Sequence, residues 1–162
     1  MQAITPFIWF ENQAEEAANF YVDIFPNSKI NKIVRYPKAA EATAGRPAGS
    51  VMTVDLVING LKFTFLNGGK QPGFELPGAI SFVINCETQE EIDKYWDALT
   101  AGGKPIQCGW LTDKFNVAWQ VVPTILSKLL SDPDSAKVER VTTCFMKMVK
   151  FDIAELEKAA KG

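Results

Sequence analysis

The sequence predicts an α+β protein of two strand–helix–three-strand modules followed by a helical tail. Two observations support this fold class. The same order of hydrophobic patterns, first strand, then helix, then three strands, occurs twice along the chain. A shift of 75 residues superposes the two occurrences, which indicates an internal repeat. With 162 residues, we expect a single domain, with module 1 at about 1–70, module 2 at about 78–123 and the tail at 124–162.

The first module begins with an apolar run over residues 4–10, which predicts a buried strand with Pro6 at its entry. Apolar residues at helical spacing from Ala14 to Phe25 predict a helix, and the turn that begins at Pro26 ends it. Three strands are then expected over residues 30–36, 51–58 and 61–66. Small residues over 37–49 predict a mobile loop, and Asn59-Gly60 predicts a tight hairpin.

The second module repeats this order with a strand over residues 79–85 and a helix that contains Ile92 and Leu99. Two short strands follow near residues 105–110 and 117–122, joined by a hairpin through Asp113 to Asn116. The 75-residue shift places Phe7 on Phe82 and, in the helices, the pair Phe20-Tyr21 on Tyr95-Trp96 and Glu15-Glu16 on Glu90-Glu91. Acidic residues at both helix starts suit the helix dipole.

The tail shows helical spacing in three segments, and the last of them starts at an Asp152-x-x-Glu155 capping pattern. We expect these amphipathic helices to cover the protein's own core, with partner binding as the alternative.

Composition excludes several classes of function. A net charge of −2 gives no reason to expect a nucleic acid or an anionic membrane as a partner. The apolar runs are too short for a transmembrane helix, and the first residues show no signal peptide. Three cysteines, at 86, 108 and 144, are widely spaced, which favours reduced thiols in a cytoplasmic protein. One disulfide with one free thiol stays the alternative.

Several motifs carry a family resemblance. They are Ile4-Thr5-Pro6-Phe7-Ile8-Trp9-Phe10, Ala14-Glu15-Glu16-Ala17-Ala18-Asn19-Phe20-Tyr21, Leu66-Asn67-Gly68-Gly69, Cys108-Gly109-Trp110-Leu111-x-Asp113, Trp119-Gln120-Val121-Val122-Pro123 and the tail from Leu129 to Leu156. With these motifs the chain resembles the PhnB-like group, also labelled 3-demethylubiquinone-9 3-methyltransferase-like, of the vicinal-oxygen-chelate (glyoxalase/bleomycin-resistance/dioxygenase) superfamily. The resemblance implies two βαβββ modules with curled mixed sheets that form a cleft, and a homodimer.

The resemblance also implies where a metal would bind. Metal-using relatives place four side chains, usually His and Glu, on the first and last strands of the two modules. The repeat and the hairpin turns assign these positions to Ile4, Thr64, Ala79 and Gln120. None of these supplies an imidazole, thiolate or carboxylate, and the chain has no histidine. The predicted strands contain one acidic residue, Asp55. We therefore expect no metal and no other cofactor, which disfavours metal-dependent glyoxalase or dioxygenase activity.

Six residues are candidates for ligand binding. They are Thr64, Ser81, Val83 and Gln120 in the expected cleft, Trp110 at its mouth, and Cys108. Cys108 is either a nucleophile or a small buried residue, because without histidine its thiolate would need another cationic group nearby. The Asn67-Gly68-Gly69 segment is either a turn or an anion cradle built from backbone amides. Asp113 and Asn116 are expected to be turn residues.

Three functions remain open from the sequence. The first is a metal-free module that binds a small, partly apolar molecule in the cleft. The second is an enzyme of the PhnB-like group with an unidentified reaction; a methyltransferase is not favoured, because no Gly-x-Gly-x-Gly turn follows the first strand. The third is a structural homodimer without a ligand.

Overall fold

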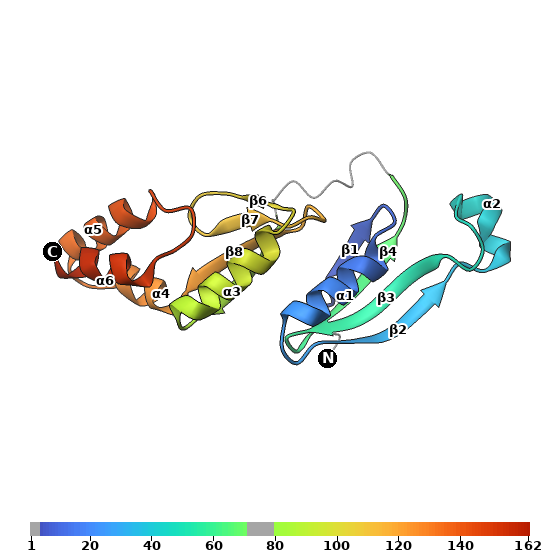
Figure 1. The fold of residues 1–162 in the computed structure, drawn as a ribbon, viewed down its shortest axis with the longest axis horizontal. Helices are drawn as coiled ribbons and strands as arrows, with labels where there is room; N and C mark the ends of the chain where they lie inside the picture. Colours follow the sequence, from blue (N-terminus) through green and yellow to red (C-terminus); the bar gives the residue numbers. More distant parts are fainter. Residues whose placement is uncertain (1–3, 71–79) are drawn as a thin grey trace. The chain divides into compact units, whose positions relative to one another are not determined.

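The computed structural model describes residues 4–70 and 80–162 and confirms the α+β class with two βαβββ modules (Figure 1). The chain divides into two compact units, Met1–Glu75 and Leu76–Gly162, and each unit contains one four-stranded mixed sheet. Their arrangement as a single domain with a shared cleft stays a prediction. Within the described ranges, no helix has both the length and the apolar character needed to cross a membrane.

The first module follows the predicted order. Its main elements are β1 (Phe7–Phe10), α1 (Ala14–Ile24), β2 (Lys29–Arg35), β3 (Val51–Ile58) and β4 (Leu61–Asn67). The strands lie in the order β1-β4-β3-β2, with β1 parallel to β4 and the other neighbours antiparallel. Helix α1 covers one face of this sheet (Figure 1). There the buried ring of Tyr21 meets the ring of Phe65 edge-on at 5.8 Å. Asn59 and Gly60 both have positive φ, as the predicted hairpin requires.

Two predictions for this module need correction. The first strand begins at Phe7 rather than at residue 4, although the Pro6 carbonyl already accepts a hydrogen bond from the Thr64 amide at 3.1 Å. The expected loop over 37–49 contains a 3₁₀ turn, η1 (Lys38–Ala40), and a short helix, α2 (Glu41–Ala44). The loop was predicted because its residues are small, but the alanines among them are good helix formers.

The second module has the same topology with shorter strands. Its elements are β5 (Phe82–Cys86), α3 (Gln89–Thr100), β6 (Lys104–Pro105), β7 (Trp110–Thr112) and β8 (Ala118–Pro123). The sheet order is β5-β8-β7-β6, with β5 parallel to β8, and α3 covers one face. The single strand expected near 105–110 is divided into β6 and β7, because Cys108 (φ 60°) and Gly109 (φ 77°) form a turn between them.

The tail consists of α4 (Thr124–Leu130), α5 (Ser135–Phe145) and α6 (Ile153–Lys161), which pack on one another. The segment between α5 and α6 attaches the tail to its own unit. Lys150 forms an ion pair with Asp93 of α3 at 2.8 Å, and the carbonyl of Phe151 accepts a hydrogen bond from the Gln89 side chain at 3.0 Å. The tail is thus anchored to α3 through several contacts.

The ladders show that the first strands of the two modules are offset by 76 residues, whereas the helices begin 75 residues apart. Phe10 and Cys86 end the first strands and pair with the last residues of β4 and β8. Both are buried. Tyr21 of α1 and Trp96 of α3, which are 75 residues apart, are also both buried. The difference arises because residues 11–13 separate β1 from α1, whereas only residues 87–88 separate β5 from α3. The predicted match of Phe7 with Phe82 is therefore wrong by one residue.

Candidate functional site

Three of the predicted ligand residues form one row across the second sheet. Gln120 of β8 is the ladder partner of Val83 on one side and of Trp110 on the other. Ladder partners project to the same face of a sheet, and here this is the face opposite the buried side chains of Trp119 and Val121. The structure thus brings together residues that are 37 positions apart in the sequence (83 to 120) on the side that α3 does not cover.

A fourth predicted residue, Ser81, joins this row through a hydrogen bond. The Nε2 amide group of Gln120 donates to the Ser81 hydroxyl oxygen at 2.9 Å, which fixes the orientation of the amide. No group among the described residues donates to the Oε1 oxygen of Gln120, so this oxygen can accept from a ligand. Val83, which is 50% exposed, and the indole of Trp110 supply apolar area beside it. We call Ser81, Val83, Trp110 and Gln120 the module 2 row.

Thr64, the remaining strand candidate, occupies the equivalent row of the first module. It is the ladder partner of Phe7 in β1 and of Asp55 in β3, and its hydroxyl donates to Oδ1 of Asp55 at 2.8 Å. The 76-residue strand offset places Phe7 on Val83, and both are exposed on the face without a helix. We call Phe7, Thr64 and Asp55 the module 1 row.

The residues at the expected metal positions do not fit a transition metal. Thr64 and Gln120 are engaged as hydroxyl and amide in hydrogen bonds with their own neighbours. Ala79 lies outside the described residues, and the strand offset moves the position equivalent to Ile4 to Ile80, which also lacks a donor atom. No cluster of three or more His, Cys, Asp or Glu side chains is found in residues 4–70 and 80–162. Zinc, nickel or iron would need such donors.

Cys108 lies in the turn before β7, outside the module 2 row. Its amide donates to the carbonyl of Met148 at 2.8 Å, and its sulfur is 3.9 Å from the carbonyl oxygen of Phe145. A neutral thiol can donate to a carbonyl oxygen, whereas a thiolate would be repelled by it. This geometry favours the interpretation of Cys108 as a small structural residue over its interpretation as a nucleophile.

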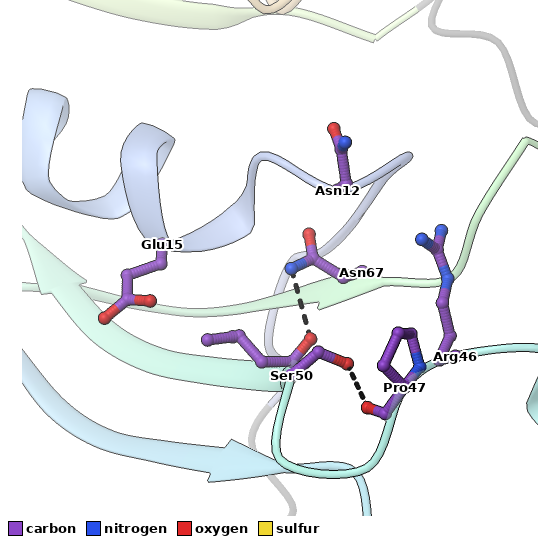
Figure 2. A pocket seen from close by; sticks show the side chains of 7 residues that line it. Asn12, Glu15, Arg46, Pro47, Ser50 and Asn67 are labelled. Atoms are coloured by element: carbon purple, nitrogen blue, oxygen red, sulfur yellow. Dashed lines mark hydrogen bonds between the residues drawn. The ribbon is translucent and has the colours of Figure 1, made fainter. Parts of the chain in front are cut away.

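Asn67 joins three elements of the first module and is a residue whose role the sequence did not reveal. Its Oδ1 accepts a hydrogen bond from the amide of Ala14 at the start of α1 at 2.8 Å. Its Nδ2 donates to the carbonyl of Val51 at 3.2 Å (Figure 2). It borders a hollow of about 180 Å³. The lining residues are Asn12, Glu15, Arg46, Pro47, Ser50, Val51 and Asn67. The Asn67 amide and the Arg46 guanidinium, which donates to the Glu11 carbonyl, are both engaged in hydrogen bonds within the fold. We therefore assign this hollow a structural role rather than a ligand-binding one.

The two glycines after Asn67 make room for a tryptophan rather than for an anion. Their amides are already used, because Gly68 donates to the Phe10 carbonyl at 3.0 Å and Gly69 to the Glu11 carbonyl at 3.1 Å. A Cβ on Gly68 would lie only 2.0 Å from the ring of Trp9, and the Trp9 indole donates to the Gly69 carbonyl at 2.8 Å. The anion-cradle interpretation is therefore wrong, and the segment holds Trp9 in place.

Asp113 confirms its expected role in a turn. It is buried, and its Oδ1 accepts the amides of Phe115 and Val117 at 2.9 and 3.0 Å. Its Oδ2 accepts the indole of Trp119 at 2.8 Å, which ties the β7–β8 hairpin to β8.

Comparison with known proteins identifies the family. The sequence model described as 3-demethylubiquinone-9 3-methyltransferase matches residues 2–122. The chain belongs to this family. The predicted resemblance to the PhnB-like group is thereby confirmed. The match ends before α4, so the predicted resemblance of the tail stays a prediction.

Solved structures agree with membership in the 3-demethylubiquinone-9 3-methyltransferase family. The chain is 33% identical to the PhnB protein from Bacillus cereus, with a TM-score of 0.67, over 76% of this chain and 100% of that one. Protein PA1353 from Pseudomonas aeruginosa is 20% identical, with a TM-score of 0.58, over 76% and 98% of the two chains. The fosfomycin resistance protein FosX from Listeria monocytogenes is 14% identical, with a TM-score of 0.55, over 81% and 98%. The last two show the fold alone. Among curated proteins, none is significantly similar to the chain.

Proposed function

We propose that the chain is a metal-free, glyoxalase-fold binding protein that holds a small, partly apolar molecule against the module 2 row. The observation that carries this proposal is the assembly of Ser81, Val83, Trp110 and Gln120 on one open sheet face. Ligand sites combine apolar area with a few fixed polar groups, and this row offers an indole, an exposed valine and an oriented amide. The proposal that no metal binds is supported by the residues at the expected metal positions, which offer no imidazole, thiolate or carboxylate.

The proposal can be tested with neutral aromatic fragments, such as 2-phenylethanol, followed by amide chemical shifts of the full chain. Binding is expected to shift the amides of β5, β7 and β8. Gln120→Ala removes one ligand hydrogen bond, and we expect it to weaken binding by about 1 kcal/mol, or about fivefold. Trp110→Ala removes the stacking surface and should weaken binding at least as much.

Asn85→Ala is the matched control, because Asn85 is exposed on the same strand as Val83 but is not part of the row. It should bind the fragment like the unmodified chain. If a fragment binds while both row variants keep full affinity, the ligand lies elsewhere and the proposal fails.

A second candidate function is methyl transfer, favoured by the description of the matching family. It requires S-adenosylmethionine or another methyl donor, and calorimetry with S-adenosylmethionine tests it directly. Heat of binding with a stoichiometry of one per chain would favour the enzyme over the binding protein. A structural homodimer is a third proposal, and a dimer mass in light scattering together with no fragment bound to either sheet would favour it.

A further inference from the structure

We propose that the module 1 row binds a small organic cation, whose ammonium group pairs with Asp55 and whose apolar part lies on Phe7. This inference rests on the proposed function, in that an open sheet face receives the ligand. It adds a separate binding surface in the first module and the charge class of the ligand that binds there.

The carboxylate of Asp55 is set up to attract a positive charge. It lies half-buried in the middle of the sheet face, and the Thr64 hydroxyl donates to its Oδ1 at 2.8 Å. Among residues 4–70 and 80–162, no lysine or arginine forms an ion pair with it, and no donor contacts its Oδ2. A half-buried carboxylate that forms no ion pair has room for one with a bound ammonium group, and such a charge-assisted contact is stronger than a neutral hydrogen bond.

Phe7 gives the same row an apolar end. Its side chain is 59% exposed, although most phenylalanines in this protein are more buried. Thr64 lies between Phe7 and Asp55, so two strand spacings, about 10 Å, separate their backbones. The side chains of Phe7 and Asp55 shorten the distance that a ligand has to cover, so an aromatic amine of the size of 2-phenylethylamine can contact both.

Two lysines compete with such a ligand. Lys32 is the ladder partner of Asp55 in β2, and Lys62 lies two residues before Thr64 in β4. Both are exposed, and neither forms an ion pair with Asp55. Solvent-exposed lysines lose entropy on pairing and gain little, so they compete weakly. Removing Lys32 is therefore expected to strengthen binding of a cation rather than to weaken it.

The experiment compares three probes of similar shape on the full chain: 2-phenylethylamine, 2-phenylethanol and phenylacetate. Amide chemical shifts follow β3 and β4 separately from β5 and β8. We expect the amine to bind the β3–β4 face about fivefold more tightly than the alcohol, and phenylacetate not to bind there. Asp55→Asn keeps an acceptor for the Thr64 hydroxyl and should remove the preference for the amine. Lys32→Ala should increase the affinity for the amine.

Asp23→Asn is the matched control, because it makes the same change in net charge at an exposed position on α1. It should keep the preference for the amine. Equal binding of amine and alcohol to the β3–β4 face, or an unchanged preference in Asp55→Asn, overturns the inference. Either result leaves the proposed function intact if the alcohol still shifts β5 and β8. Failure at β5 and β8 with amine binding at β3–β4 overturns the proposed function instead.

Discussion

Substituting Gly109 by alanine tests a tightly packed turn of the second module. A Cβ at this position would lie 2.4 Å from a ring carbon of Phe151 and 2.6 Å from the carbonyl oxygen of Val121. Its φ of +77° is also unfavourable for any residue with a side chain, at about 1 to 2 kcal/mol. Overpacking against a buried ring and a backbone atom adds about 1 to 3 kcal/mol. We therefore expect Gly109→Ala to lower the free energy of unfolding by about 2 to 5 kcal/mol.

Gly102→Ala is the matched control because Gly102 belongs to the same unit and has a φ of +80°. Its nearest neighbour is the Cβ of Lys114 at 3.3 Å, an exposed side chain that can move. The control should lose only the backbone part, about 1 to 2 kcal/mol. Urea unfolding of both variants, followed by tryptophan fluorescence, measures the difference. If Gly109→Ala is no more destabilising than Gly102→Ala, the packing of Phe151 on this turn is not as described.

Two further predictions concern buried polar and thiol groups. Asn67→Ala leaves one amide and one carbonyl without partners, so the free energy of unfolding should fall by about 2 to 4 kcal/mol in urea unfolding, whereas Asn19→Ala, at an exposed helix position, should cost under about 1 kcal/mol. Burial, and secondarily the charge of Glu91, raises the pKa of the Cys86 thiol from 9.0 to about 11. Because the folded state holds the thiol neutral, this contribution is complete below pH 9 and is lost as the pH rises towards 11. Cys86→Ala should flatten the decline of stability over this range, and an equally steep decline would contradict the assignment.

Strong local patterns made most of the fold predictable from the sequence. The apolar spacing of α1, the alternation in β3 and the Asn59-Gly60 turn each depend on neighbouring residues alone, and the structure has all three. The split between β6 and β7 was not predicted, because it depends on a cysteine in a left-handed conformation. That conformation is accompanied by hydrogen bonds to carbonyls of the distant tail, such as Met148.

The candidate site was predictable in part for the same reason. The turn at Asp113 to Asn116 set the register of β8, and this register places Gln120 beside both Val83 and Trp110. The role of Asn67 could not be predicted, since its partners are 53 and 16 residues away. A polar residue at the end of an apolar strand was the signal that could have identified it. The match of Phe7 with Phe82 was wrong because the connection between strand and helix is one residue shorter in the second module, so one constant shift cannot align both the strands and the helices.

That loop difference limits how the two halves can be exchanged. In a chimera that placed the longer connection of residues 11–13 between β5 and α3, the strand and helix could not both keep their present positions. Moving a strand by one residue turns each side chain to the opposite face. Val83 would then face the helix, while Phe82 and Ile84 would face solvent. A hybrid built from these halves must therefore take each first strand, its connection and its helix from the same module.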